Sequence, residues 1–232
     1  MSTPEPGLDE RLARVLERLR AAEARYGRAA GSVGLLAVSK THPAACVRAV
    51  AAHGQRAFGE NYLQEALDKQ AALADLSLDW HFIGPVQSNK TRRLAEAFDW
   101  VHTVDRLKIA QRLSDQRPSA RAPLQLCLQV NISGEASKSG LAPAEVPALA
   151  QAVAALPRLR LRGLMAIPEP AGDAAAQRAP HRALRELLAA VNERCGLQLD
   201  TLSMGMSADL EAAVAEGATM VRIGTALFGA RG

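Results

Sequence analysis

One lysine stands where an amine could do chemistry. Lys40 directly follows the apolar run Leu35–Ser39, which is typical of a strand buried on both faces. An isolated ammonium is costly to bury, so this side chain must reach solvent or find a partner. Position alone favours a solvent-exposed lysine at a strand–loop junction. The functional alternative is a desolvated amine of lowered pKa, which is suited to forming a Schiff base with an aldehyde.

The choice of amines is narrow, because the basic residues of the chain are mostly arginine. Only five lysines occur: Lys40, Lys69, Lys90, Lys108 and Lys138. Any amine chemistry must come from these side chains or from the N-terminus.

Two segments near the C-terminus could bind an anion. Met204–Ser207 leads into a predicted helix over Ala208–Glu216, and the free backbone N–H groups at a helix start attract negative charge. Gly224 ends a later strand, where a glycine lets the backbone approach a ligand. Taken singly, Ser207 is most often a helix N-cap and Gly224 a turn residue. Because the two segments follow adjacent strands, a phosphate site that they form together is as well supported as these two separate roles.

Arg222 adds a cation to this region. It lies two residues before Gly224, so the two positions share one face of the strand. If the strand belongs to a barrel, that face is the interior near the top. An interior guanidinium needs an acceptor, and either a ligand heteroatom or an Asp or Glu carboxylate could be that acceptor.

Short apolar runs and helical segments must position these groups. An apolar stripe at steps of three and four predicts an N-terminal helix over residues 8–27. Strands are predicted at Leu35–Ser39, Ala57–Gly59, Trp80–Ile83, Trp100–Thr103, Leu124–Val130, Leu161–Ala166, Thr201–Met204 and Met220–Ile223. Helices are predicted between them at Ala44–His53, Tyr62–Leu73, Gln87–Phe98, Arg106–Gln116, Ala144–Leu156, Ala176–Cys195 and Ala208–Glu216.

The alternation predicts an α/β protein of one domain over residues 1–232. Continuous apolar strands separated by helices indicate a parallel sheet that helices cover. Eight such repeats over residues 34–232 fit a closed (β/α)8 TIM barrel, and an open doubly wound sheet is the alternative. In a barrel, the residues that follow the strands form the active face, which would bring Lys40, Ser207 and Gly224 together.

Composition excludes several classes of protein. Hydrophobic residues make up 48% and charged residues 22% of the chain, which is ordinary for a globular protein. The net charge is only +4 and aromatic residues are 3%, so we expect no nucleic-acid partner. The three widely spaced cysteines form neither a disulfide framework nor a metal site. No apolar run is long enough for a membrane span, and the first residues carry no secretory signal, so we expect a cytoplasmic protein.

Five motifs in order resemble one known family. They are Ala37–Thr41 (AVSKT), Phe58–Tyr62 (FGENY), Trp80–Gly84 (WHFIG) with Gln87–Lys90 (QSNK), Ser203–Ser207 (SMGMS) with Asp209, and Val221–Thr225 (VRIGT). The chain closely resembles the pyridoxal phosphate homeostasis proteins, the YggS-like or PROSC-like family. The resemblance extends from the first predicted strand to the C-terminus.

This resemblance implies a fold-type III barrel, similar to the N-terminal domain of alanine racemase, and a cofactor, pyridoxal 5′-phosphate (PLP). It implies that Lys40 forms a Schiff base with PLP and that Arg222 faces the pyridine nitrogen. Asn61 would lie near the ring, and Ile83 and Met204 would line the pocket. The phosphate would be held by Ser207, Gly224, Thr225 and the backbone amides around Met206.

The sequence departs from the family at one position. His42 stands where many relatives have a second lysine, so any transfer step that uses that lysine must proceed differently here. Lys138 matches another lysine of the family, although a solvated loop lysine is the simpler interpretation.

Arginine at the ring nitrogen bears on activity. A guanidinium cannot accept a proton, so Arg222 would favour the unprotonated ring and a weaker electron sink. Racemisation also needs a second acid or base on the opposite face of the ring. Only eight residues follow Gly224, which leaves no room for the β domain that supplies this group in racemases. Of the two tyrosines, Tyr62 could approach the site but is expected to begin a helix.

We therefore predict a protein without catalytic residues that takes part in vitamin B6 homeostasis. It would buffer PLP or supply it to PLP-dependent apo-enzymes, and the resemblance suggests a monomer. The alternatives are a weak amino-acid racemase or related PLP enzyme, and a barrel that binds another phosphate ester.

Overall fold

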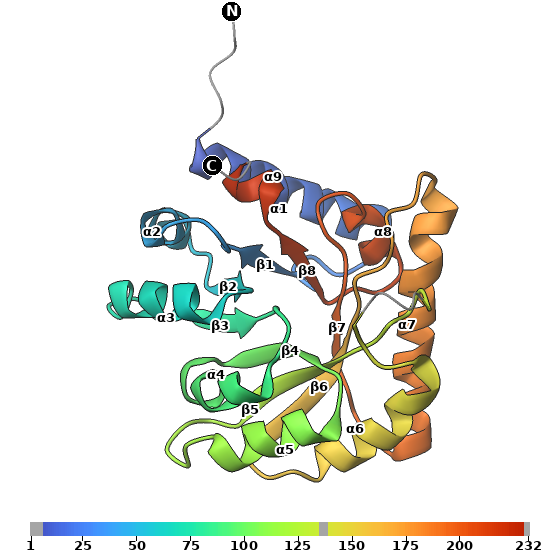
Figure 1. Ribbon diagram of the computed structural model, residues 1–232. Coiled ribbons are helices and arrows are strands. Elements are labelled where there is room, and N and C mark those ends of the chain that lie inside the picture. Colours follow the sequence, from blue (N-terminus) through green and yellow to red (C-terminus); the bar gives the residue numbers. More distant parts are fainter. Residues whose placement is uncertain (1–6, 135–138, 230–232) are drawn as a thin grey trace, which may run out of the picture.

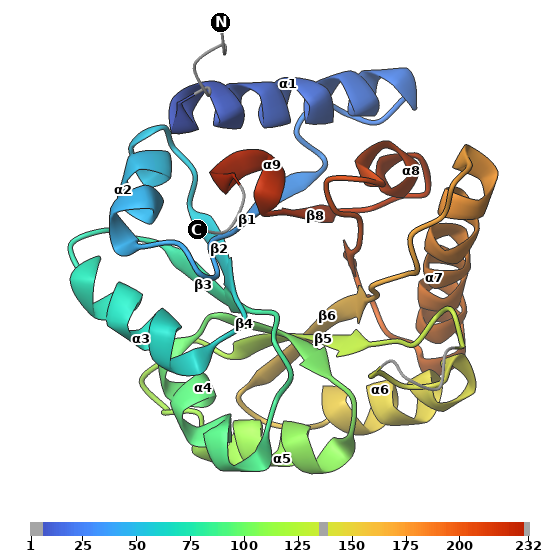
Figure 2. The ribbon, with the colours of Figure 1, turned by 45° about the horizontal axis from the view of Figure 1, so that its top comes forward.

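The computed structural model describes residues 7–134 and 139–229, and their strands form a closed parallel barrel in the order β1 to β8. The strands are β1 Gly34–Val38, β2 Ala57–Glu60, β3 Asp79–Phe82, β4 Trp100–Val104, β5 Leu124–Gln129, β6 Leu159–Met165, β7 Thr201–Ser203 and β8 Met220–Ile223. Figure 2 shows this ring of strands with helices around it. The predicted (β/α)8 barrel is confirmed.

Helices follow the strands and cover the outside of the barrel (Figure 1). They are α1 Leu8–Arg25, α2 Ala44–Ala52, α3 Leu63–Ala72, α4 Thr91–Ala97, α5 Leu107–Gln116, α6 Val146–Ala154, α7 Ala174–Cys195, α8 Leu210–Ala215 and α9 Thr225–Phe228, with short 3-10 turns at Ser88–Lys90 (η1) and Pro143–Glu145 (η2). The main apolar core fills the layer between these helices and the sheet.

Pairing between the first and last strands closes the barrel. Leu36 of β1 lies opposite Arg222 of β8, and on the other edge of β1 Ala37 lies opposite Phe58 of β2. Because every strand from β1 to β8 has a parallel neighbour on both sides, the sheet has no edge strand and the open doubly wound sheet is excluded. The register also carries Lys40 and Gly224, which follow β1 and β8, to the same end of the barrel.

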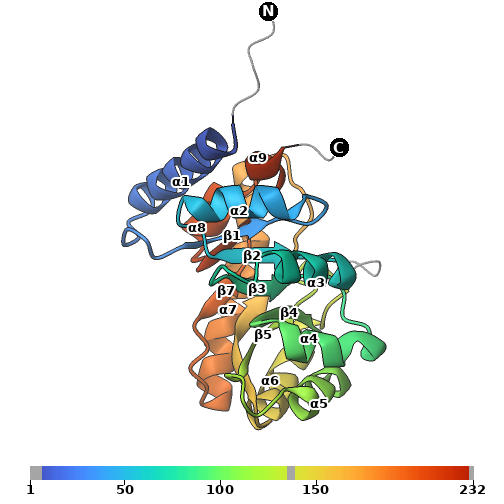
Figure 3. The ribbon, with the colours of Figure 1, turned by 90° about the vertical axis from the view of Figure 1, so that its left-hand side faces the viewer.

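Helix α1 lies outside the ring and packs against α2, α8 and α9 (Figures 2 and 3). Its buried stripe includes Leu12, Val15 and Leu19, as the periodicity predicts. The helix ends at Arg25, and Gly27 follows with a φ of +65°, which glycine adopts without strain. The predicted N-terminal helix is therefore confirmed, with its end two residues earlier than expected.

Several helices differ from the sequence prediction in their boundaries, and one was missed. The helix predicted over Gln87–Phe98 begins as the turn η1 and continues as α4, and the helix predicted from Ala208 begins only at Leu210. The short helix α9 was not predicted, because four residues are too few for a periodic pattern.

Two features are absent from the described ranges, 7–134 and 139–229. None of the helices there is both long enough and apolar enough to cross a membrane. The same residues contain no group of three or more His, Cys, Asp or Glu side chains arranged to hold a metal ion.

Asp173 caps helix α7, and its removal should weaken the fold slightly. Its Oδ1 accepts a hydrogen bond of 2.8 Å from the backbone N–H of Ala176. We expect Asp173→Ala to lower the free energy of unfolding by about 1 kcal/mol, because that N–H loses its side-chain acceptor. Urea denaturation measures the change. Asp173→Asn keeps an acceptor and should stay close to the parent, so equal losses in both variants would contradict a capping role.

Candidate functional site

A cavity of about 340 Å³ opens at the carboxyl ends of the strands. Its volume lies within the range of small-molecule sites. The residues that line it are Val38, Lys40, Asn61, Ile83, Met165, Ile167, Met206, Ser207, Ala208, Arg222, Gly224 and Thr225. Eight of the nine residues predicted from the sequence are in this set, so segments far apart in the chain meet here as expected.

Met204 is the exception. Its side chain is fully buried and is not among the described residues that line the cavity. It follows β7 directly, and its N–H donates to the carbonyl of Met220 in β8, so it continues the sheet and packs in the core. Sequence reasoning also missed four lining residues at or just after strand ends: Val38 of β1, Met165 and Ile167 at β6, and Ala208 after β7. Their place at a strand end was the available signal.

Lys40 supplies the amine of the site. It lies two residues after the end of β1, is half-buried, and lines the cavity. It carries the only primary amine among the described residues that line this cavity. The next residue, Thr41, has a φ of +66°, a left-handed conformation that is uncommon for a β-branched residue.

Asn61 contributes an unsatisfied acceptor. Its side-chain Oδ1 is buried and has no hydrogen-bond partner among the described residues. The residue also lines the cavity. The backbone here is held close to the next strand: a Cβ on Gly84 would lie 2.2 Å from the carbonyl oxygen of Asn61. Only glycine fits at position 84 without moving Asn61. Because an orphaned buried oxygen is costly, its place at the cavity wall indicates a ligand donor.

Arg222 closes the inner end of the site as a buried cation. Its Nη1 donates to the carbonyl and the Oγ of Ser203 at 2.5 and 3.0 Å, and its Nη2 donates to the carbonyl of Ala166 at 2.8 Å. These acceptors are neutral, so the carboxylate partner considered from the sequence is absent among its hydrogen bonds in the described residues. Burial lowers the pKa of Arg222 to about 10, which leaves it charged at neutral pH.

Two buried histidines extend this network into the barrel. His102 Nδ1 lies 2.8 Å from Ser203 Oγ, and His102 Nε2 lies 2.9 Å from His81 Nδ1. Burial lowers the pKa of His81 to about 3. Burial, with the nearby His81 and Arg222, lowers the pKa of His102 well below its usual value. Both rings are therefore neutral at pH 7, and Arg222 is the cation of this group.

The loop after β7 differs from the predicted helix cap. The backbone N–H of Met206 donates to Asp209 Oδ1 at 2.7 Å, which turns the chain and delays the start of α8 to Leu210. Ser207 is thus not an N-cap, and the N–H of Met206 is already engaged. Burial opposes ionisation of Asp209, but hydrogen bonds from His181 and Met206 outweigh it and lower the pKa of this carboxyl.

Ser207 has a different anchor. Its carbonyl accepts a hydrogen bond of 2.7 Å from Arg18 of α1, and the same guanidinium binds both carboxylate oxygens of Glu211 in α8. Within the described part of the chain, the N–H groups of Ser207 and Ala208 donate to no backbone acceptor. The loop therefore lines the cavity with two N–H groups that donate to no backbone acceptor in the described residues, while Arg18 of α1 holds its Ser207 carbonyl.

The turn after β8 approaches the end of β1 closely. A Cβ on Gly224 would lie 3.3 Å from the carbonyl oxygen of Val38, a tight contact. Thr225 begins the short helix α9, and its side chain is exposed at the cavity. Ser207 and Thr225, which both carry a hydroxyl, thus line one cavity from two different loops.

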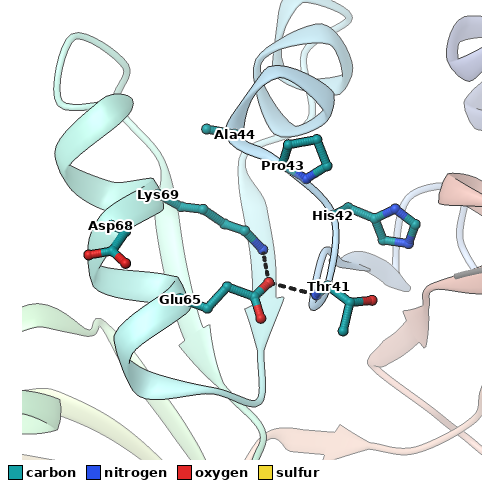
Figure 4. A pocket seen from close by; sticks show the side chains of 7 residues that line it. All are labelled: Thr41, His42, Pro43, Ala44, Glu65, Asp68 and Lys69. Carbon is teal, nitrogen blue, oxygen red and sulfur yellow. Dashed lines mark hydrogen bonds and ion pairs between the residues drawn. The ribbon is translucent and has the colours of Figure 1, made fainter. Parts of the chain in front are cut away.

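A second, shallower depression of about 560 Å³ lies beside this cavity, over the loop after β1 and helix α3 (Figure 4). It is lined by Thr41, His42, Pro43, Ala44, Glu65, Asp68 and Lys69. His42 stacks on Phe228 with a ring-centre distance of 5.1 Å and does not line the main cavity. Lys138 lies outside the described residues.

Charge decides what the main cavity can bind. Among its described lining residues, the ionisable side chains are Lys40 and Arg222, both basic. With two cations, two hydroxyls and two unengaged backbone N–H groups, the cavity suits a small anion that also carries a group reactive toward an amine.

Comparison with known proteins identifies relatives over nearly the whole chain. The family model for "Alanine racemase, N-terminal domain" matches residues 11–232. The "Pyridoxal phosphate homeostasis protein" of Pseudomonas aeruginosa is 68% identical over 222 residues, covering 96% of this chain and 95% of the relative. The protein of the same name from Escherichia coli K12 is 54% identical over 223 residues, covering 95% of each.

Solved structures agree with this assignment. PipY of Synechococcus elongatus, solved with PLP bound, superimposes with a TM-score of 0.85 at 42% identity and covers 96% of this chain and 100% of its own. Alanine racemase of Corynebacterium glutamicum, at 20% identity, shares the fold with a TM-score of 0.74, covering 96% of this chain and 62% of its own. The chain therefore belongs to the pyridoxal phosphate homeostasis protein family, whose barrel has the fold of the alanine racemase N-terminal domain.

Proposed function

We propose that this chain binds pyridoxal 5′-phosphate at Lys40 and serves vitamin B6 homeostasis by buffering the cofactor and supplying it to PLP-dependent apo-enzymes. The observation that carries the proposal is the pairing of one amine with one buried guanidinium in a single cavity at the strand ends. The family membership and the PLP bound to PipY support it.

The residues of the cavity fit this cofactor. Bound PLP supplies an aldehyde that condenses with a primary amine, and Lys40 offers that amine. The buried Oδ1 of Asn61 lacks a donor, which a polar substituent of the ring would provide. A side chain at position 224 would press against the Val38 carbonyl, so glycine lets the turn after β8 stay close to β1 at the cavity wall.

Each part of the cavity would then have one task. The hydroxyls of Ser207 and Thr225, with the N–H groups of Ser207 and Ala208, would hold the phosphate. Arg222 would donate to the ring nitrogen without protonating it, because a guanidinium does not give up its proton at neutral pH. Ile83 and the side chain of Met206 would cover the ring.

Transfer of the cofactor tests the supply role. PLP-loaded protein is mixed with an apo-aminotransferase in the presence of a phosphatase that destroys free PLP. We expect the apo-enzyme to regain activity faster than with an equal amount of free PLP under the same phosphatase. Activation no better than that of free PLP would contradict the supply role and leave only storage.

We also propose that the protein is a cytoplasmic monomer. Sedimentation of the purified chain checks the oligomeric state, and fractionation of cells checks the compartment.

We further propose that the chain does not turn over amino acids. Racemisation needs an acid or base on each face of the ring, and Lys40 is the only such group among the described residues that line the cavity. Tyr62 does not supply the second, because its side chain is 54% exposed and it stands at the start of α3 outside the cavity. Chiral chromatography of an amino-acid panel should show no conversion beyond free PLP. Sustained turnover that Lys40→Ala abolishes would establish a racemase instead.

A further inference from the structure

A buried ionic cluster lies next to the loop that carries Lys40. It consists of Ser39, Glu60, Glu65 and Lys69, and the side chains of Lys69 and Glu60 are 5% and 0% exposed. The Lys69 ammonium donates to the Ser39 carbonyl at 2.7 Å, to Glu60 Oε1 at 2.7 Å and to Glu65 Oε1 at 2.6 Å. Ser39 Oγ also donates to Glu60 Oε1 at 2.6 Å.

This cluster holds both peptide groups that flank Lys40. On one side, the Ser39 carbonyl accepts from Lys69. On the other side, the Thr41 N–H donates to Glu65 Oε1 at 2.6 Å. Lys69 and Glu65 bind each other from adjacent turns of α3, so the two anchors form one unit (Figure 4). The backbone of Lys40 is therefore fixed from both sides by a single helix.

The strained backbone of Thr41 explains why this anchoring is needed. Its φ of +66° places a β-branched residue in the left-handed region, a strained conformation that persists only when the surroundings impose it. The charge-assisted bond from the Thr41 N–H to Glu65 offsets that strain. Without it, the Thr41 N–H loses this acceptor and the turn is held more weakly, through the Ser39 carbonyl, which accepts from Lys69 and from the His42 N–H at 3.1 Å.

The cluster also distinguishes the two neighbouring lysines. All three N–H bonds of the Lys69 ammonium are used, toward one carbonyl and two carboxylates. These three bonds hold the Lys69 nitrogen inside the cluster, and Lys69 is not among the described residues that line the main cavity. Lys69 is thus a structural cation beside the reactive amine rather than a competitor for the same ligand.

We propose that Glu65 and Lys69 are positioning residues that fix the backbone of Lys40 so that its amine points into the cavity. This role rests on the proposed function, because the position of the Lys40 amine matters only if PLP attaches to it. Loss of the contacts that Glu65 and Lys69 make around Lys40 should slow the attachment of PLP and weaken its binding, while the barrel stays folded.

The decisive variant is Glu65→Ala, which removes the acceptor of the Thr41 N–H. We expect the dissociation constant for PLP to rise about tenfold, equivalent to about 1.4 kcal/mol, and attachment to slow. Glu65→Gln retains an acceptor oxygen and should recover part of the affinity. Adding Thr41→Asn to Glu65→Ala should also recover part, since asparagine tolerates a positive φ.

A readout without ligand separates this inference from the proposed function. Hydrogen exchange of the Thr41 amide, followed by NMR, should accelerate in Glu65→Ala. The matched control is Glu145→Ala, which removes a carboxylate acceptor of another backbone N–H, that of Ala142, and should leave PLP binding unchanged.

The outcomes are distinct. If the parent protein fails to bind PLP, the proposed function is wrong. If the parent binds PLP and Glu65→Ala does so with the same rate and affinity, the positioning role is wrong. Unchanged exchange of the Thr41 amide in Glu65→Ala would also overturn it.

Discussion

Lys40→Ala should abolish covalent attachment of PLP and raise its dissociation constant by at least about 100-fold, equivalent to about 2.7 kcal/mol. The reason is that Lys40 carries the only amine among the described residues that line the cavity. Arg222, Ser207 and Thr225 would remain and bind the cofactor weakly through its ring and phosphate. Absorption spectroscopy should show loss of the visible band of the parent complex, and borohydride reduction with mass spectrometry should find no modified lysine.

Lys108→Ala is the matched control, because Lys108 is an exposed lysine on α5. It should retain the parent spectrum and affinity. A Lys40→Ala protein that still forms a borohydride-stable adduct would show that another amine carries the cofactor. Lys138 would then be the first lysine to test, and peptide mapping would identify it.

Lowering the pH from 7 to 5 should reduce the free energy of unfolding by about 4 kcal/mol through His81 and His102 together. Both histidines have lower pKa values in the folded protein than the usual 6.5, mainly because of burial. Between the folded and unfolded pKa values, the unfolded chain binds more protons, so stability is full above about pH 6.5 and falls with decreasing pH. Each histidine contributes about 2 kcal/mol over this interval.

Urea denaturation at several pH values measures this dependence. The variant His102→Asn removes one titrating group but keeps polar atoms near Ser203 and His81. Its loss of stability between pH 7 and 5 should be smaller than that of the parent by about 2 kcal/mol. Identical pH slopes for the parent and the variant would show that His102 takes up its proton between pH 7 and 5 in the folded protein as it does in the unfolded chain, contrary to the lowered pKa that its burial implies.

The fold was predictable because its signals are local. Each strand is a short apolar run, and each run ends in polar or glycine residues such as Lys40 and Gly224, which the parallel barrel brings to one end. Alternation along β8 placed Arg222 and Gly224 on one face, and both do line the cavity. Closure of the sheet was not visible in the pattern, because pairing of β1 with β8 is a contact between the two ends of the barrel sequence.

The details that escaped prediction depend on contacts distant in sequence or on single side chains. Ser207 has the residue type of an N-cap, but Asp209 turns the loop and moves the helix start. Met204 follows a strand like the lining residues, yet its side chain packs in the core. Glu65 and Lys69 look like an ordinary i,i+4 surface pair, and only the fold shows that they hold the turn at Lys40.

The bond from Arg18 to the Ser207 carbonyl spans 189 positions of the chain, and its pair with Glu211 spans 193. During synthesis on the ribosome α1 emerges early, whereas its partners Ser207 and Glu211 follow only when nearly the whole barrel has been synthesised. Contacts of such long sequence separation form late in folding, because the intervening loop must first be closed. Nascent or truncated chains should therefore order the loop at Ser207 last, so that binding of PLP would report that synthesis of the barrel is finished.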